Sequence, residues 1–287
     1  MKGPAIIRSG WWVALAAVAV TLAVGAVLVA PLFDRAPGSS QEADFDLADT
    51  AVPSNLIVRA MTRDGVRALV APAMVDAKEV DRFNREERGK MLVPDDRVIG
   101  IEISGDARAY PLRLMRWHEV VNDVVGGEAV AVTYSPLCDS VAVFSREVEG
   151  EVVEFGVSGL LYNSNTLLYD RRSGPPATPL WLQLDGRPVA GPTPGSRPQL
   201  ALRPATLTTW ASWRARHPAT RVLAPLPDMK RLYKRDPYHS YFGSDLLRFP
   251  VEPLPPTEGL LLKDRLVIIT IEGEDAAFPL PALAEAA

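Results

Sequence analysis

The sequence predicts a mainly β fold, a β-rich α+β protein whose single domain has few short helices and follows one transmembrane helix. Short strand-like segments separated by glycine-containing turns occupy most of residues 97–190. One hairpin unit occurs twice, and an uncharged apolar run occupies residues 10–33. The 287 residues are 47% hydrophobic and 23% charged, as in globular proteins, and a net charge of −4 gives no reason to expect nucleic acid binding.

The apolar run predicts an uncleaved signal anchor. Lys2 and Arg8 precede it, so residues 1–9 are expected in the cytoplasm. A helix needs about 20 apolar residues to cross the hydrocarbon core, whereas a cleaved signal peptide usually has an apolar core of roughly 7–15 residues. The chain would then cross the cell membrane once and leave the rest outside the cytoplasm. In a bacterium that location is the periplasm or the outer cell surface.

The next segment, residues 34–55, is small, polar and acidic, which predicts a flexible linker. The folded extracytoplasmic domain is expected to comprise residues 56–287. Alternation and turn residues predict its strands in order. These are residues 98–104, 107–110, 129–134, 141–150, 151–159, 166–170 and 180–189. Gly105 with Asp106 forms the expected turn of the first hairpin.

Helical signals are fewer. Residues 206–218 predict one helix, with Thr206 or Thr208 as the N-cap and Pro218 just past its end. A short helix is expected over residues 112–117. The chain therefore has few helices beside many strands.

An internal repeat aligns residues 96–115 with residues 264–283 without gaps. Shared glycine and proline positions indicate a repeated strand–turn–strand–proline unit and need only backbone explanations. Arg108 of the first copy corresponds to Ala276 of the second, which ends before any equivalent of His118 or Cys138. Only the first copy carries candidate chemistry.

Cys138 is the only cysteine, so no internal disulfide can form. It lies just past a predicted strand, in a loop where functional groups are often displayed. A reactive thiolate needs a nearby cation, which His118 or Arg108 would supply. The alternative is a buried, inert thiol.

His118 begins the run His-Glu-Val-Val-Asn-Asp, which resembles the zinc protease motif only at its start. Asn122 stands where that motif requires a second histidine, so this protease class is excluded. An imidazole beside the carboxylates of Glu119 and Asp123 could bind a metal, act as a base, or serve only the structure.

Two functional hypotheses use these residues, and a third does not. In the first, Cys138 and His118 bind copper or zinc, and Asp123 or Met115 completes the site. In the second, an acyl transferase or hydrolase uses Cys138 as nucleophile and His118 as base. Glu119 or Asp123 would orient that base, and Arg108 would stabilise the oxyanion. The third is a non-catalytic β-rich interaction domain. Whether the protein is an enzyme, and whether its partner is a protein or a small molecule, stay open.

Several runs together resemble a known bacterial family. They are Val-Ile-Gly-Ile-Glu, Arg-Ala-Tyr-Pro-Leu, Trp-His-Glu-Val-Val-Asn-Asp, Val-Thr-Tyr-Ser-Pro-Leu-Cys-Asp-Ser and Phe-Gly-Val-Ser-Gly-Leu-Leu-Tyr-Asn-Ser. They resemble the family of domain of unknown function 3179, and the likeness implies an exported or membrane-anchored bacterial protein. Family members typically have a second cysteine where this chain has Ser135. That departure removes a dithiol–disulfide cycle and weakens a two-thiolate metal site.

Overall fold

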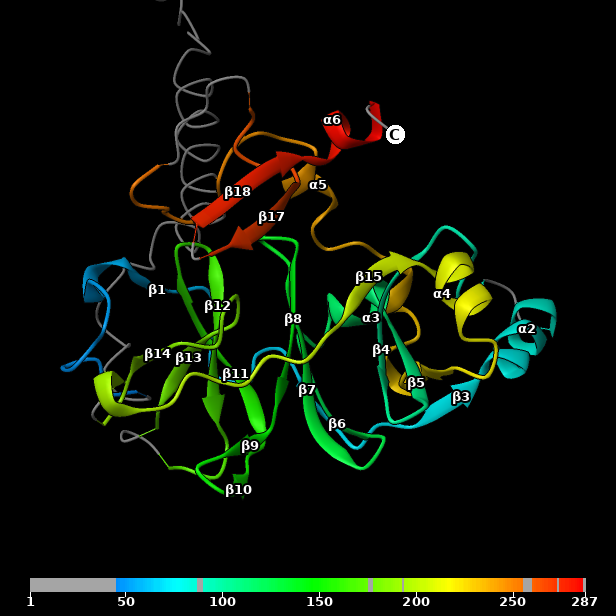
Figure 1. Ribbon diagram of the computed structural model, residues 1–287, viewed down its shortest axis with the longest axis horizontal. Helices are drawn as coiled ribbons and strands as arrows, with labels where there is room; N and C mark the ends of the chain where they lie inside the picture. The colour runs from blue at the N-terminus through cyan, green and yellow to red at the C-terminus, as the bar shows by residue number, and fades with distance from the viewer. Residues whose placement is uncertain are drawn as a thin grey trace, which may run out of the picture. The chain divides into compact units, whose positions relative to one another are not determined.

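The computed structural model describes residues 45–86, 90–174, 178–192, 194–254, 260–272 and 274–285 (Figure 1). The chain divides into two units, Met1–Gln41 and Glu42–Ala287, and the second is the domain considered below. The predicted membrane segment, residues 10–33, lies outside the described residues. Among the described residues, no helix has the length and apolarity that crossing a membrane requires.

The described part is β-rich, as predicted, and its strands form three larger sheets. The first sheet has the order β1 (Ile57–Arg59), β11 (Phe155–Tyr162), β12 (Asn165–Asp170), β13 (Leu180–Leu182), β14 (Pro188–Ala190). The second has the order β2 (Leu69–Val70), β6 (Val120–Val125), β7 (Glu128–Ser135), β8 (Ser140–Ser145). The third has the order β15 (Thr206–Thr209), β4 (Arg97–Ile103), β5 (Asp106–Pro111), β16 (Arg221–Leu223), β3 (Met74–Asp76).

Two hairpins and several short helices complete the described fold. The hairpins are β9 (Glu147–Val148) with β10 (Glu151–Val152), and β17 (Leu266–Ile271) with β18 (Glu274–Pro279). The α-helices are α2 (Ala77–Glu86), α3 (Leu112–Met115), α4 (Trp210–Arg216), α5 (His239–Phe242) and α6 (Leu280–Glu285).

The sheet β2-β6-β7-β8 lies between the other two larger sheets (Figure 1). Alternate residues of its strands point to opposite faces. Val132 of β7 packs with Ile99 and Tyr110 of the third sheet, whereas its neighbour Ala131 packs with Phe155 of the first. Both faces of the middle sheet are therefore buried, and side chains at its strand ends lie close to a neighbouring sheet.

The helix predicted over residues 206–218 begins later than expected. Thr206–Thr209 instead form β15, which pairs antiparallel with β4. The helix α4 starts at Trp210, and Thr209 caps it by accepting a hydrogen bond from the amide of Ser212 at 3.3 Å. β-branched threonines fit an edge strand better than a helix interior, so the predictions of Thr206 or Thr208 as the cap were wrong.

Part of the predicted linker is packed against the domain. The Phe45 side chain is fully buried and lies edge-on to Tyr169, with ring centroids 5.6 Å apart. Thr50 forms a β-bridge with Ala190. The folded unit therefore begins at least as early as residue 45 rather than at residue 56, and residues 34–44 lie outside the described residues.

The internal repeat is visible in the backbone. β4–β5 followed by α3 corresponds to β17–β18 followed by α6, although Gly273 of the second turn lies outside the described residues. The first turn consists of Ser104 and Gly105, one residue earlier than predicted, and both have positive φ (50° and 81°). Such φ values suit a two-residue hairpin turn. The first copy is buried in the third sheet, whereas Ile268 of the second is 62% exposed.

Candidate functional site

Glu119 occupies an unusual position at the start of the middle sheet. It follows α3 and precedes β6, and its φ of 56° lies in the left-handed region. Its amide donates to the Met115 carbonyl oxygen at 2.7 Å, and its carbonyl oxygen accepts from the Tyr134 amide at 2.8 Å. A non-glycine residue in this region costs about 1–3 kcal/mol, and such strain clusters at functional sites.

The Glu119 side chain is buried and points toward the first sheet. Thr166 Oγ1 of β12 donates a hydrogen bond to Glu119 Oε2 at 3.0 Å. Burial raises the pKa of this carboxyl to about 7, and the Thr166 hydrogen bond only partly opposes the rise. A carboxyl with a pKa near neutrality can both give and take a proton under physiological conditions.

A cavity of about 190 Å³ adjoins Glu119. The walls are mostly apolar and come from Met61, Leu137, Val157, Leu160, Leu161 and Phe249. Thr166, Tyr238 and Arg248 add polar groups to the same cavity. An apolar cavity with a few converging polar groups and a perturbed carboxyl is the usual form of a small-molecule site.

Ser135 connects this carboxyl with the loop that holds Cys138. Ser135 Oγ lies 3.3 Å from Thr166 Oγ1 and accepts from the Thr166 amide at 3.2 Å. The Ser135 side chain also forms a hydrogen bond that lowers the pKa of the Cys138 thiol. Hydroxyl groups therefore link the Glu119 carboxyl to the thiol by way of Thr166 and Ser135.

Cys138 lies in the loop after β7, as predicted, with the residue exposed but the thiol turned toward the protein. Its Sγ donates to the Ser164 carbonyl oxygen at 3.2 Å. Burial raises the pKa of the thiol, and hydrogen bonds from Asn165 and Ser135 oppose the rise without cancelling it. The thiol is therefore protonated at neutral pH.

The loop around Cys138 is held in a strained and well-bonded conformation. Asp139, Asn163 and Ser164 all have positive φ, between 47° and 62°. The Asp139 carboxylate accepts hydrogen bonds from Arg97, Tyr134 and Arg265 at 3.0 Å or less. These contacts fix the position of Cys138 relative to Ser135.

His118 is fully buried beside the site, and both of its ring nitrogens have protein partners. Nδ1 lies 2.8 Å from the Arg67 carbonyl oxygen, so Nδ1 carries the proton and donates. Nε2 is then the acceptor for the Tyr233 hydroxyl at 2.6 Å. Burial lowers the pKa of His118, and the hydrogen bond to Arg67 only partly opposes that effect.

The structure does not join His118 to Cys138. No hydrogen bond links the two, and within the described residues no group of three or more His, Cys, Asp or Glu side chains is arranged to hold a metal ion. Both the catalytic pair and the metal-binding pair predicted from the sequence require the side chains of His118 and Cys138 to meet.

Arg108 and Asp123 belong to a separate buried network. Arg108 Nη1 lies 2.7 Å from Asp123 Oδ1, and Arg108 also bonds Asp106. Tyr110 Oη donates to Asp123 at 2.7 Å. The pKa of Arg108 is raised, because these two carboxylates outweigh the effect of burial. Arg108 is thus engaged between β5 and β6 rather than aimed at the thiol.

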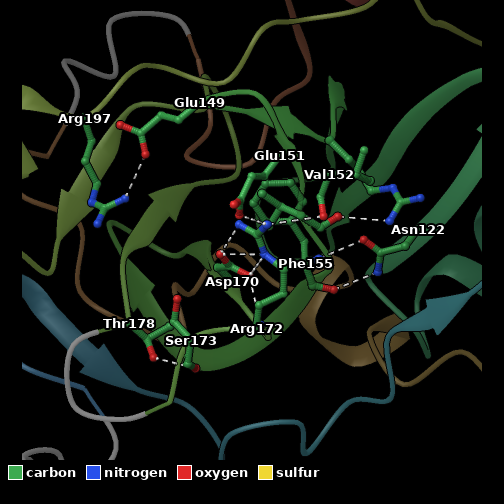
Figure 2. Close-up of polar contacts among 12 residues, drawn as sticks. Asn122, Glu149, Glu151, Val152, Phe155, Asp170, Arg172, Ser173, Thr178 and Arg197 are labelled. Atoms are coloured by element: carbon green, nitrogen blue, oxygen red, sulfur yellow. Dashed lines mark hydrogen bonds and ion pairs between the residues drawn. The ribbon is translucent and has the colours of Figure 1, made fainter.

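Asn122, the other polar residue of this motif, connects two sheets. Its amide group bonds both the amide nitrogen and the carbonyl oxygen of Phe155 at 2.8 Å, as Figure 2 shows. The same view shows Arg172 bonded to Asp170 and Glu151 farther along the first sheet. The Asn122 hydrogen bonds hold the middle sheet against the first, whereas the Arg172 contacts join the end of β12 to β10.

Three residues of the cavity were missed by sequence reasoning. Thr166 was read only as part of a strand, and Tyr238 and Arg248 follow the predicted helix in a segment without a recognisable motif. Glu119 itself was treated only as a residue that orients His118. No periodicity or spacing marks these side chains, because they converge from β12, the start of β6 and the segment around α5.

Comparisons with known proteins agree with the resemblance seen in the motifs. A family model described as "Protein of unknown function (DUF3179)" matches residues 63–287. No curated protein and no solved structure matches the chain. The matched range covers the three larger sheets almost entirely and includes every residue of the cavity except Ala60 and Met61. The chain therefore belongs to the DUF3179 family of proteins of unknown function.

Proposed function

We propose that this protein binds a small molecule in the cavity beside Glu119 and that Glu119 exchanges a proton with it. The single observation that carries the proposal is a buried carboxyl at the wall of a cavity, with its pKa raised to about 7. Burying a carboxyl that has one hydroxyl donor among the described residues costs free energy. A group poised to gain and lose a proton at neutral pH offers a reason for that cost.

Two further observations support the proposal. The left-handed backbone of Glu119 aims its side chain at the first sheet, and left-handed residues recur around the neighbouring thiol. The cavity volume of about 190 Å³ corresponds to roughly six water molecules, which suits a small ligand.

The test begins with the purified full-length protein and a panel of small aliphatic amines, carboxylates, alcohols and amino acids. A compound that binds the cavity raises the melting temperature of the wild type but not of Ala60→Trp, which fills the cavity. Ala205→Trp, at an exposed residue just before β15 that lines no cavity among the described residues, is the matched control.

Calorimetry of the binding compound in two buffers of different ionisation enthalpy then counts the protons exchanged. We expect proton exchange at pH 7 in the wild type and none in Glu119→Gln. The proposal fails if every stabilising compound acts equally on Ala60→Trp, or if the proton exchange persists in Glu119→Gln.

A second candidate function uses Cys138 as a nucleophile toward an acyl group. The hydroxyl groups of Ser135 and Thr166, which link Cys138 to Glu119, favour it. The thiol proton, which is donated to the Ser164 carbonyl oxygen in this structure, would turn to Ser135, and Ser135 and Thr166 would each pass a proton on toward Glu119. The sulfur would form a bond to the acyl carbon while the thiol proton passes to the Glu119 carboxylate. The leaving group would depart with the proton returned by Glu119, and water would release the acyl group. Glu119 thus takes the role that the sequence assigned to His118.

Mass spectrometry after incubation with a p-nitrophenyl ester tests this candidate. We expect one acyl group attached at Cys138 in the wild type. No acyl group should be attached in Cys138→Ser. If acylation proceeds equally in Glu119→Gln, the proposed proton route is wrong.

Metal binding by Cys138 and His118 has less support, because Arg67 and Tyr233 occupy the two ring nitrogens. Copper or zinc binding would require His118 to give up one of these partners. Metal analysis of the purified protein tests this, with the Cys138→Ala, His118→Ala double variant for comparison. Equal metal content in both proteins would exclude the site.

We also propose that residues 10–33 anchor the chain in the cell membrane with the domain outside the cytoplasm. The support is the uncharged apolar run preceded by Lys2 and Arg8. A fusion of alkaline phosphatase to the C-terminus, active only outside the cytoplasm, tests this orientation. An inactive fusion that is still expressed would contradict it.

A further inference from the structure

We propose that the ligand of the Glu119 cavity is a small zwitterion with an aliphatic body, such as an aliphatic amino acid. Its ammonium group would pair with Glu119 and its carboxylate with Arg248. This inference rests on the proposed function, because it names the ligand class of the same cavity. Three features support it: an incompletely bonded buried carboxyl, a guanidinium at the same cavity, and mostly apolar side chains in the rest of the lining.

Glu119 supplies the anionic end of the proposed ligand site. Within the described part of the chain, the only side chain that donates to it is Thr166, which bonds Oε2. Among the described residues no donor bonds Oε1, and Glu119 lines the cavity, so Oε1 can accept a hydrogen bond from a ligand there. A buried carboxylate is stabilised most strongly by a cation that also donates hydrogen bonds, and a primary ammonium has three donors.

Arg248, which lines the same cavity, supplies the cationic end. Among the described residues, no carboxylate lies within ion-pair distance of its guanidinium, whose central carbon sits 5.4 Å from the centre of the Tyr241 ring. A guanidinium forms paired hydrogen bonds with a carboxylate. Tyr238 lines the same cavity and lies near enough to both Glu119 and Arg248 for their charges to affect the pKa of its hydroxyl.

The remaining walls limit the rest of the ligand. Val157, Leu160 and Leu161 of β11 line the cavity, and so do Leu137 from the loop after β7 and Phe249 from the segment after α5. None of these side chains offers a hydrogen bond to a sugar or a nucleobase. The volume is below the roughly 300 Å³ at which drug-sized ligand sites begin. A short aliphatic body between the two charged groups meets these limits.

The pH dependence of binding distinguishes a zwitterion from a simple carboxylate. The titratable and charged groups that line the cavity with Glu119 are Tyr238 and Arg248, because β11, β12 and the segments at residues 60–61 and 136–137 contribute only uncharged side chains to the lining. Ionised Glu119 attracts an ammonium group and repels a carboxylate. With a pKa of about 7, the ionised fraction rises about tenfold from pH 6 to pH 8. The affinity for a zwitterion should rise by about the same factor.

The experiment is calorimetry on the purified full-length protein with three probes: L-leucine, 4-methylpentanoate, which lacks the amine, and 3-methylbutylamine, which lacks the carboxylate. At pH 8 we expect L-leucine to bind at least tenfold more tightly than either of the others, and about tenfold more weakly at pH 6. Glu119→Gln should remove this pH dependence. Arg248→Gln should reduce L-leucine to the affinity of the amine, whereas Arg235→Gln, at another exposed arginine, should have no effect.

The inference is overturned if 4-methylpentanoate binds as tightly as L-leucine, or if L-leucine binds better at pH 6 than at pH 8. It is also overturned if none of the three probes binds the wild type more tightly than Ala60→Trp. The broader proposal of a proton-exchanging cavity survives each of these results under one condition. Another compound of the panel must bind the wild type but not Ala60→Trp, and its binding must be accompanied by proton exchange with Glu119.

Discussion

Thr166 Oγ1 donates a hydrogen bond to Glu119 Oε2 at 3.0 Å, although the two residues belong to different sheets and lie 47 positions apart. The contact places a carboxyl from the start of the middle sheet against the β11–β12 hairpin of the first sheet. It is the only side-chain hydrogen bond that opposes the effect of burial on this carboxyl among the described residues. The stability of the fold should therefore depend on the protonation of Glu119.

Glu119→Gln should remove a loss of stability that the wild type undergoes as the pH rises from about 4.5 through about 7. The pKa of Glu119 is about 7 in the folded protein, against a usual value of 4.5. The folded state therefore holds more protons than the unfolded state between these values, and stability falls as pH rises from about 4.5 through 7. The difference corresponds to about 3 kcal/mol. Urea unfolding at pH 5 and pH 8.5 measures it.

The control for that prediction is Glu151→Gln, at a carboxylate whose side chain is 75% exposed. It should keep the pH dependence of the wild type. If the wild type and Glu119→Gln lose the same free energy of unfolding between the two pH values, the Glu119 carboxyl is not the group responsible.

Tyr233→Phe should destabilise the domain by about 1–3 kcal/mol, because it leaves Nε2 of the buried His118 without its hydroxyl donor. Thermal or urea unfolding measures the loss. Tyr162→Phe, at a partly buried tyrosine, should cost less. An unchanged stability in Tyr233→Phe would mean that His118 does not depend on this contact and is free for another role.

Arg108→Met should cost about 3–5 kcal/mol, since it leaves Asp123 buried without its cation. Arg221→Met is the matched control, because Arg221 pairs with the same Asp106 but its side chain is 47% exposed. An exposed ion pair contributes about 1 kcal/mol or less. Equal losses from the two variants would contradict the assignment of Arg108 to a buried structural network.

Cys138 should react slowly with iodoacetamide at neutral pH, because burial raises the pKa of its thiol. The rate should reach its midpoint at a higher pH than that of a cysteine peptide measured in parallel. Ser135→Ala should move the midpoint higher still, since Ser135 lowers the pKa of the thiol. A midpoint below that of the peptide would instead indicate an activated nucleophile.

The sequence by itself determined the β-rich class, most strand positions, the repeated hairpin and the family. These features are local, because alternation, paired glycines in turns and a recurring motif each involve only nearby residues. Thr206–Thr209 were predicted as the start of a helix but form the strand β15, and they show where prediction from local patterns fails. Their strand conformation depends on pairing with β4, more than 100 positions earlier in the chain.

Only the tertiary structure decided which polar residues act together. His118, Glu119 and Asp123 are neighbours in sequence, yet they face Tyr233, Thr166 and Arg108 respectively. Strand alternation and the left-handed turn at Glu119 send adjacent side chains to different sides of the middle sheet. The cavity then forms where β11, β12 and the segment around α5 meet Glu119. Packing between the sheets stabilises this arrangement. It depends on residues far apart in the chain, so no short stretch of sequence predicts it.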